Sequence, residues 1–390
     1  MTDAELTDAE ALRKELRAWL DEHFTDDVRA AVADRGTDEA FEAQRLWNAE
    51  LFDAGWAAIA WPPEFGGRSA GLPEQLAYSE EMARVGAPGS VNPIGVANIA
   101  PAIMTYGTPE QQQRFIRPML RGDEIWSQGM SEPEAGSDLA SLRCRAVLDG
   151  DHFVVTGQKT WNSNGDRADW CQLYVRTNVD VPKHQGITCL LVDMKTPGIE
   201  VRPIKTMAGD AGFAEVFFDE ARIPLTALLG EIDDGWSVAT RTLGNERAGV
   251  ATMYLHIRRK LDRLLEAAAE PGVDGRRPVD APTARDRLAQ RYIDARILEL
   301  LAKRTLGAAL AGKMPGPEGS VIKLAWAASD QSLTNTAVDI LGMPGLEGSW
   351  AWDLLASRSL TIAGGTTEVN KNIIGERVLG LPREPKPPTT

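Results

Sequence analysis

The chain has few cysteines and histidines and no long apolar run. Three of its 390 residues are cysteine and four are histidine, and they form neither a CxxC pair nor a Cys/His cluster. This spacing differs from that of zinc sites and disulfide frameworks, so we expect buried free thiols at Cys144, Cys171 and Cys189 and no metal site. No apolar run reaches the roughly 18 residues that span a bilayer, and residues 1–16 lack the apolar core of a secretory signal. We therefore expect a cytoplasmic protein without membrane insertion.

Positive charge is also in deficit. The chain has 42 Lys and Arg against 56 Asp and Glu, a formal net charge of −14. Such a surface repels the phosphate backbone, so nucleic acid is excluded as a partner held by bulk charge. A phosphate-bearing small ligand is not excluded, because a few arginines and helix N-termini set the local potential of a cleft. With 43% hydrophobic residues, the chain is long enough for two or three domains with a sizeable core.

The secondary-structure signals change type along the chain. Residues 1–123 are expected to form an N-terminal helical domain, in which the capping-box spacing of Thr7–Glu10 precedes an apolar stripe from Leu12 to Leu20. Residues 124–235 contain short runs of Val, Ile, Phe and Thr separated by turn signals, for example the Asp-Gly at 149–150. Strands at close spacing without intervening helices predict an antiparallel β domain, a small barrel or a sandwich.

Helical periodicity returns over residues 236–380, the expected C-terminal helical domain. Its helices are expected at 236–269, 284–312, 319–342 and 366–379. The proline-rich residues 381–390 are expected to be a disordered tail. The predicted fold is therefore α+β, with a helical domain, a β domain and a C-terminal helical bundle, and ligands favour the clefts where such domains meet.

Two stretches contain residues suited to binding. WSQGMSEPEAGSDLASL (126–142) groups small and hydroxyl residues, which let a ligand approach backbone N–H groups; an interdomain loop with a glycine turn explains the pattern slightly better. GQKTWNSNG (157–165) places a Trp beside hydroxyl and amide donors, which suits a planar heteroaromatic cofactor; a hairpin with a packed Trp is the alternative. Neither pattern decides between its two explanations.

Together, these two stretches resemble those of the acyl-CoA dehydrogenase flavoprotein family. The resemblance continues through WPPEFGG, PGIEVRPI, GWSVATRTLGNER and GGTTEVNKNIIGERVLGLP, in the family's order and spacing over most of the chain. It implies the family's three-domain fold, FAD held across a subunit interface, and oxidation of an acyl-CoA thioester to the trans-2-enoyl-CoA in lipid β-oxidation. It also implies an electron-transfer flavoprotein as electron acceptor and an oligomer, either a homotetramer or a heterotetramer.

The resemblance further implies roles for single residues. Met130 and Ser131 match contacts to the flavin's pyrimidine edge, Trp161 matches the residue against the ring, and Ser163 matches the hydrogen bond near N5. Ser137 falls where the family contacts acyl-CoA. The complete set that it assigns to FAD is Gln128, Met130, Ser131, Trp161, Ser163, Thr366 and Glu368.

The catalytic base is absent from the position where many family members have it. That Glu immediately precedes a Gly-Thr near the C-terminus, and Gly364 stands there in this chain; its backbone N–H still matches a donor to the thioester carbonyl. The base must be a desolvated carboxylate, because a thioester α proton is very weakly acidic. Glu246 lies three residues past Leu243 on an apolar stripe of the expected helix 236–269. An ion pair with Arg247 is the structural alternative.

Isovaleryl-CoA and long-chain acyl-CoA dehydrogenases resemble this chain in having the base on the equivalent helix, within a Glu-Arg pair. We therefore predict that Glu246 removes the α proton, with Arg247 as an orienting neighbour, while flavin N5 accepts the β hydride. The space left by Gly364 favours a branched or ring-bearing acyl group, for example a steroid's side chain.

Two features differ from the family's pattern. The family's Arg-x-x-Phe-Gly is missing, with Arg276, Arg277 or Arg285 as substitutes, and its Gln-x-Phe-Gly-Gly becomes DILGMPG with Asp339 in place of Gln. An acidic group disfavours a nearby pyrophosphate. These differences leave two alternatives: a mainly scaffolding subunit of a heteromeric dehydrogenase, and a flavin oxidase or monooxygenase. The basic run 258–260 is expected to be a solvated helix face, with a CoA-phosphate contact as the alternative.

Overall fold

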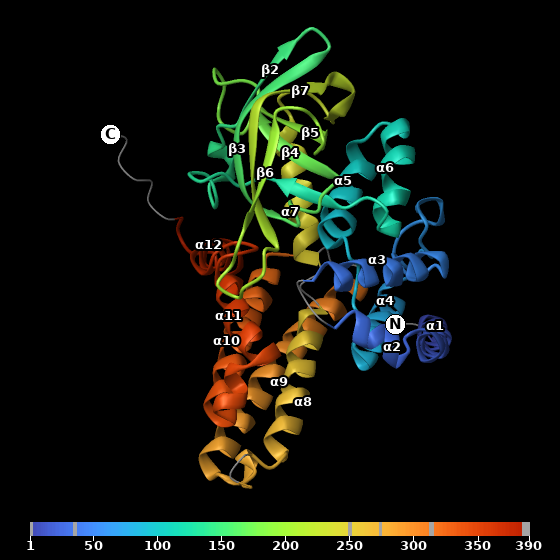
Figure 1. Ribbon diagram of the computed structural model, residues 1–390, viewed down its shortest axis with the longest axis vertical. Coiled ribbons are helices and arrows are strands. Elements are labelled where there is room, and N and C mark those ends of the chain that lie inside the picture. Colours follow the sequence, from blue (N-terminus) through green and yellow to red (C-terminus); the bar gives the residue numbers. More distant parts are fainter. Residues whose placement is uncertain (1–2, 34–36, 249–251, 273–274, 312–315, 384–390) are drawn as a thin grey trace. The chain divides into compact units, whose positions relative to one another are not determined.

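The computed structural model describes residues 3–33, 37–248, 252–272, 275–311 and 316–383, without the side chains of residues 3–6 and 244–248. The chain divides into two compact units that meet in sequence between Glu246 and Arg247. The first contains helices and a β-sheet, and the second is helical (Figure 1). The α+β class with its helical, β, helical order is confirmed. The domain borders at 123, 235 and 380 stay predictions.

The N-terminal helices enclose an apolar core. They are α1 (Asp3–His23), α2 (Asp26–Ala31), α3 (Asp38–Asp53), α4 (Leu72–Val85), α5 (Ala100–Tyr106) and α6 (Pro109–Arg121). The predicted stripe is confirmed, since Leu12, Leu16 and Leu20 are buried with Trp47. The capping-box spacing at Thr7–Glu10 does not mark the start of a helix, because α1 has already begun at Asp3. Capping-box spacing also occurs by chance inside a helix, so it does not by itself mark a helix end.

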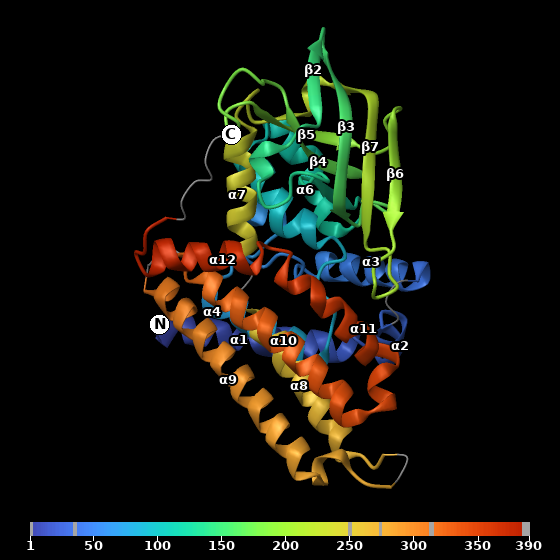
Figure 2. The same ribbon diagram turned by 90° about the vertical axis from the view of Figure 1, so that its left-hand side faces the viewer.

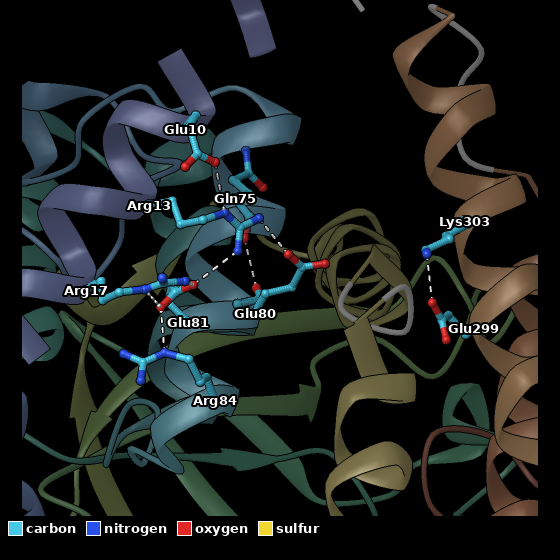
Figure 3. A network of polar contacts seen from close by, with 10 residues as sticks. Glu10, Arg13, Arg17, Gln75, Glu80, Glu81, Arg84, Glu299 and Lys303 are labelled. Carbon is cyan, nitrogen blue, oxygen red and sulfur yellow. Dashed lines mark hydrogen bonds and ion pairs between the residues drawn. The ribbon is translucent and has the colours of Figure 1, made fainter. Parts of the chain in front are cut away.

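A buried carboxylate joins α1 to α4. Glu81 accepts hydrogen bonds from Arg17 at 2.7 Å, from Arg84 at 2.8 Å and from Arg13 at 3.2 Å (Figure 3). Arg13 also reaches Glu80 at 2.7 Å. Three guanidinium groups around one buried carboxylate compensate the cost of removing its charge from water, so the pair of helices is held together at this point.

The middle of the chain forms one eight-stranded sheet among the described residues. Its strands are β1 (Trp126–Gly129), β2 (Arg145–Asp149), β3 (His152–Ser163), β4 (Trp170–Arg176), β5 (Ile187–Asp193), β6 (Ile199–Ile204), β7 (Phe213–Pro224) and β8 (Leu228–Leu229). The order is β6-β7-β3-β2-β4-β5-β8, with β1 beside β4. The sheet is mostly antiparallel as predicted, but β4 pairs in parallel with β1 and β2. The predicted turn at 149–150 joins β2 to β3, with Gly150 at φ +61°.

The two faces of the sheet bury different side chains. Along β4, Tyr174 packs with residues of α5, α6 and α7, whereas Leu173 and Val175 pack into a second core within the sheet domain. Alternate side chains of a strand point to opposite faces, so both faces of β4 are apolar because both are covered. All three cysteines are buried free thiols, as predicted, with Cys171 on β4, Cys189 on β5 and Cys144 directly before β2.

The expected helix 236–269 is wrong. Helix α7 runs from Gly235 to Ala248 and a separate helix, α8, begins at Met253, while residues 249–251 lie outside the described residues. In the sequence, Gly249 and the β-branched Val250 and Thr252 are residues of low helix propensity, which the apolar periodicity did not take into account. Within α7, the Thr242 hydroxyl lies 3.3 Å from that of Tyr174, which attaches the helix to the sheet.

The second unit is a bundle of helices. They are α8 (Met253–Ala269), α9 (Pro282–Leu310), α10 (Gly319–Leu341), α11 (Gly348–Ala356) and α12 (Thr367–Ile373), and α8, α9 and α10 pack side by side (Figure 2). The short α11 was not predicted. Lys260 donates to Asp330 at 2.6 Å and lies 3.4 Å from Asp353. The end of the basic run 258–260 therefore joins three helices rather than facing water, and burial raises the pKa of Asp330.

Candidate functional site

The two motif stretches at 126–142 and 157–165 meet in the sheet unit. The backbone N–H of Thr160 donates to the carbonyl oxygen of Ser131 at 2.9 Å. The ammonium of Lys159 donates to the carbonyl oxygen of Met130 at 3.0 Å. These bonds place the Met130–Ser131 segment beside the end of β3, next in sequence to Trp161. The two stretches therefore form one site, which sequence spacing alone did not establish.

A buried ion pair lies under this junction. Lys159 is fully buried, and its Nζ lies 2.8 Å from Oε1 of Glu132. The same carboxylate accepts the backbone N–H groups of Arg143 at 2.6 Å and Cys144 at 2.8 Å. Buried charges need such partners, because removing them from water is costly. Sequence reasoning missed this pair, although a Lys amid the buried positions of a strand was an available signal.

Trp161 is presented to the outside by an irregular strand. The pairing of β3 with β7 shifts register between Lys159 and Asn162, and Trp161 within this bulge has φ +60°. Trp161 is 58% exposed, and its indole packs edge-to-face with the Phe213 ring, at 5.7 Å between centroids. A left-handed backbone at a non-glycine residue is strained, and such strain is concentrated at functional sites. Ser163, half-buried, ends the same strand opposite Phe213.

The side chain of Gln128 forms a hydrogen bond within the sheet. Its amide Nε2 donates to Oε1 of the neighbouring Gln172 at 3.0 Å. Within the described residues, several buried polar atoms of this region lack a hydrogen-bond partner: Trp126 Nε1, Ser127 Oγ, Asn162 Oδ1 and Gln172 Nε2. Buried polar atoms are normally paired, so their concentration on β1, β3 and β4 marks this part of the sheet as unusual.

The loop after β1 is fixed at both ends. Ser137 is exposed, and its neighbour Asp138 accepts from Lys183 at 2.7 Å and from Ser141 at 2.5 Å. The hydrogen bonds from Lys183 and Ser141 lower the pKa of Asp138. The buried Arg176 donates to the carbonyl oxygens of Ala140 and Leu142, and burial lowers its pKa. A ligand that meets Ser137 would therefore meet a loop already held in one conformation.

The double glycine lies in the C-terminal unit. Gly364 has φ +65° and Gly365 has φ +87°, both in the left-handed region that favours glycine. The Gly365 carbonyl oxygen accepts from Lys323 at 2.6 Å and from Asn370 at 2.8 Å. Thr366 caps α12, its hydroxyl accepting the N–H of Val369 at 3.2 Å. Glu368, in the first turn of α12, is exposed to solvent.

Comparison with known proteins accounts for this order of motifs. Three models of one family match the chain in succession: the acyl-CoA dehydrogenase N-terminal domain at residues 7–123, the middle domain at 127–221 and the C-terminal domain at 233–379. The chain belongs to the acyl-CoA dehydrogenase family. The resemblance inferred from the motifs is thereby confirmed, and the protein is an oxidoreductase of this family.

Relatives that match over nearly the whole chain support the same family assignment. Acyl-CoA dehydrogenase IpdE1 of Mycobacterium tuberculosis is 39% identical over 393 residues, which cover 98% of this chain and 100% of the relative. A solved structure described as the Tcur3481-Tcur3483 steroid ACAD is 29% identical, with a TM-score of 0.85, and covers 97% of this chain and 98% of its own. The ChsE4-ChsE5 complex from Mycobacterium tuberculosis is 32% identical, with a TM-score of 0.83, and covers 98% of this chain and 99% of its own.

The acyl-CoA dehydrogenase uses FAD, the cofactor of its family. The residues of the sheet unit fit a flavin ring. The exposed indole of Trp161 offers a flat apolar face, and the half-buried hydroxyls of Ser131 and Ser163 lie on the segments that flank it. A flat face beside polar donors suits a heteroaromatic ring. Within the described residues, each helix is too short or too polar to cross a bilayer.

The structure gives partners to residues at both differences from the family's pattern, Asp339 in place of Gln and the missing Arg-x-x-Phe-Gly. Asp339 forms an ion pair with Arg287 at 2.7 Å, so its negative charge is partly compensated. Of the three arginines considered as substitutes, Arg277 instead pairs with Asp280 at 2.8 Å. The sequence did not reveal that Arg287 is the partner of Asp339. The two residues lie on different helices, α9 and α10, and only packing of these helices brings them together.

The predicted base lies at the end of α7. Position 246 is in the last turn of the helix, and the side chains of Glu246 and Arg247 lie outside the described residues. Thr242, one turn earlier, is buried against Tyr174 of the sheet. Spacing of four residues puts positions 242 and 246 on the same side of a helix. The assignment of Glu246 as the base stays a prediction.

Proposed function

We propose that the protein removes an α proton and a β hydride from an acyl-CoA thioester, giving the trans-2-enoyl-CoA, and that Glu246 is the base. The observation behind this proposal is Gly364, a residue without a side chain at the position where many relatives have the base. Glu246 is the carboxylate one helical turn past the sheet-bound Thr242. A carboxylate in such a site is a suitable general base, because low polarity raises its proton affinity.

In this proposal, the backbone N–H of Gly364 binds the thioester carbonyl oxygen. Charge builds up on this oxygen as the α proton leaves, so a fixed donor stabilises the transition state. Ser137 contacts the acyl-CoA from the loop held by Arg176. Arg247 orients Glu246. Lys323 and Asn370 hold the carbonyl group of the next residue, Gly365, and so restrict the turn to which this N–H belongs.

Gln128, Met130, Ser131, Trp161 and Ser163 would hold the flavin ring from the sheet unit. Thr366 and Glu368 would contact FAD from the C-terminal unit. FAD, when bound, supplies the acceptor for the β hydride. Trp161 covers the ring and excludes water, while Ser131 and Ser163 provide hydroxyl donors to its polar edge.

We further propose a ring-bearing acyl group, such as a steroid-derived side chain, as the substrate. Gly364 leaves space where relatives have a carboxylate, which favours bulk near the α carbon. One solved relative is described as a steroid ACAD, which supports this substrate class. Discrimination by a pocket depends on shape, with about 1–3 kcal/mol for each methylene, so a panel of acyl groups is needed to assign the chain.

A heteromeric assembly is the second candidate. Two solved relatives are described by pairs of names, Tcur3481-Tcur3483 and ChsE4-ChsE5, and one of them is named as a complex. Asp339 in place of the family's Gln weakens the expected pyrophosphate site, and an unlike subunit would complete it. A homo-oligomer of this chain is the alternative assembly for the same fold. An electron-transfer flavoprotein is the proposed electron acceptor in both assemblies. The cytoplasmic location stays a prediction.

The test is the visible spectrum of the purified protein during anaerobic addition of straight, branched and ring-bearing acyl-CoA thioesters. Bleaching of the flavin band by ring-bearing thioesters supports the proposal. Bleaching only by straight chains overturns the substrate class. A colourless protein that acquires FAD only with an unlike partner favours the heteromeric candidate, and rapid reoxidation by oxygen favours an oxidase.

A further inference from the structure

We propose that the buried pair of Lys159 and Glu132 positions the loop that holds the flavin, by fixing the peptide between Met130 and Ser131. The inference rests on the proposed role of these two residues at the pyrimidine edge. Neither member of the pair belongs to the binding residues that the sequence predicted. Both are charged residues inside the sheet unit, where a purely structural core would be apolar.

The pair controls the direction of one peptide group. Lys159 donates to the carbonyl oxygen of Met130 at 3.0 Å, so this oxygen points toward the buried ammonium. In a planar trans peptide, the N–H points away from the carbonyl, so the N–H of Ser131 is directed away from Lys159. Within the described residues, no acceptor is found for this N–H. It is therefore a fixed donor for a carbonyl oxygen of a bound ring.

The next peptide is fixed as well. The carbonyl oxygen of Ser131 accepts the N–H of Thr160 at 2.9 Å, and the N–H of Glu132 donates to the carbonyl oxygen of Ala135 at 3.1 Å. Two successive carbonyl groups are thus held by residues of β3, directly before Trp161. The segment that meets the ring edge and the side chain that covers the ring are therefore mounted on the same strand.

Glu132 keeps the ammonium in place. Its Oε1 accepts from Lys159 at 2.8 Å and from the Cys144 N–H at 2.8 Å, and its Oε2 accepts from the Arg143 N–H at 2.6 Å. Loss of Lys159 alone leaves a buried carboxylate without its counter-ion, which is strongly destabilising. Joint replacement by neutral groups of similar shape removes that cost. Comparing the single replacement with the joint replacement therefore distinguishes an effect on stability from an effect on flavin positioning.

The experiment compares the wild type, Lys159→Met, and the double variant Lys159→Met with Glu132→Gln. Arg222→Gln is the control, because it breaks an exposed ion pair with Asp149 (2.8 Å) in the same sheet. For each protein, the melting temperature is measured in excess FAD. FAD retained per chain, the FAD dissociation constant and the shape of the visible flavin band are measured alongside.

We expect the single variant to lose both stability and FAD. We expect the double variant to regain most of the melting temperature while its FAD dissociation constant stays raised about tenfold or more, as for loss of a hydrogen bond to a charged group. The flavin band should shift as well, since the ring edge loses a fixed donor. The control should match the wild type.

Two results separate this inference from the proposed function. A double variant that binds FAD as tightly as the wild type, with an unchanged band, overturns the positioning role, even if the single variant fails to fold. A wild-type protein that never takes up FAD, alone or with an unlike partner, overturns the proposed function instead.

Discussion

The ammonium of Lys323 lies 2.6 Å from the carbonyl oxygen of Gly365, and Lys323 itself is buried on α10. Asn370 donates to the same oxygen at 2.8 Å. Glycine pairs with positive φ have many accessible conformations, so two donors on one carbonyl are what restrict this turn. The N–H of Gly364, proposed to bind the thioester carbonyl, belongs to the same turn and lies two peptide groups before the held carbonyl.

Lys323→Met should therefore lower turnover about tenfold, corresponding to about 1.4 kcal/mol of transition-state stabilisation, with little change in FAD content. Asn370 keeps one hydrogen bond to the turn, so the loss should be partial, and Lys323→Met with Asn370→Ala should lower turnover further. Steady-state kinetics separates kcat from KM. Lys371→Met, at an exposed position of α12, is the matched control. Equal turnover in Lys323→Met and the control would contradict the role of Lys323.

Glu246→Gln should strongly slow α-proton removal while FAD stays bound. General bases contribute about 10²–10⁴-fold, so flavin bleaching by a reactive thioester should slow by at least that factor. Stopped-flow absorbance under anaerobic conditions measures the rate directly. Glu266→Gln, at an exposed position of α8, controls for loss of one negative charge. Bleaching at the wild-type rate in Glu246→Gln would mean that another carboxylate is the base.

The N-terminal helices should loosen in acid because of Glu81. Hydrogen bonds from Arg17 foremost, then from Arg84 and Arg13, lower the pKa of Glu81 from 4.5 to about 2. A lowered carboxyl pKa gives stability that is present above the unfolded value near 4.5 and is lost as the pH falls toward 2. The difference corresponds to about 3 kcal/mol at neutral pH.

Hydrogen exchange of α1 between pH 6 and pH 3, corrected for intrinsic rates, measures this effect. Protection of α1 should decrease over this range in the wild type, and Glu81→Gln should have low protection with a much weaker pH dependence. Glu10→Gln is the control. Glu10 also pairs with Arg13, but its side chain is largely exposed and the distance is longer, at 3.5 Å. A pH dependence that persists unchanged in Glu81→Gln would assign it to other carboxylates.

The three thiols should be unreactive in the folded protein. Burial raises the pKa of Cys144 to about 12 and that of Cys171 to about 11, and it raises the pKa of Cys189 further. The thiolate is the reactive form, so little of it is present near pH 8. A disulfide-exchange reagent should detect all three thiols only after denaturation. Rapid labelling of the native protein would show that the sheet core opens readily.

The sequence predicted the fold well where the signal was local. The apolar stripe of α1, the Asp-Gly turn before β3 and the helical periods of α9 and α10 each arise within one element, so they are visible in the chain itself. The division into α7 and α8 was missed, because the apolar period of the sequence continues from one helix into the next. The parallel pairing of β1 with β4 was missed because strand neighbours are chosen by tertiary packing.

For the site, the order of motifs over the chain was enough to indicate the family and FAD, since these depend on which residues are present, while the base at Glu246 stays a prediction. The pairing of Lys159 with Glu132, of Arg287 with Asp339 and of Lys323 with Gly365 needed the tertiary structure. Each joins residues at least 27 positions apart, and a charged side chain in a sequence does not name its partner. Burial then decides which of these contacts matter, because charges removed from water must be compensated by whichever groups the fold brings within reach.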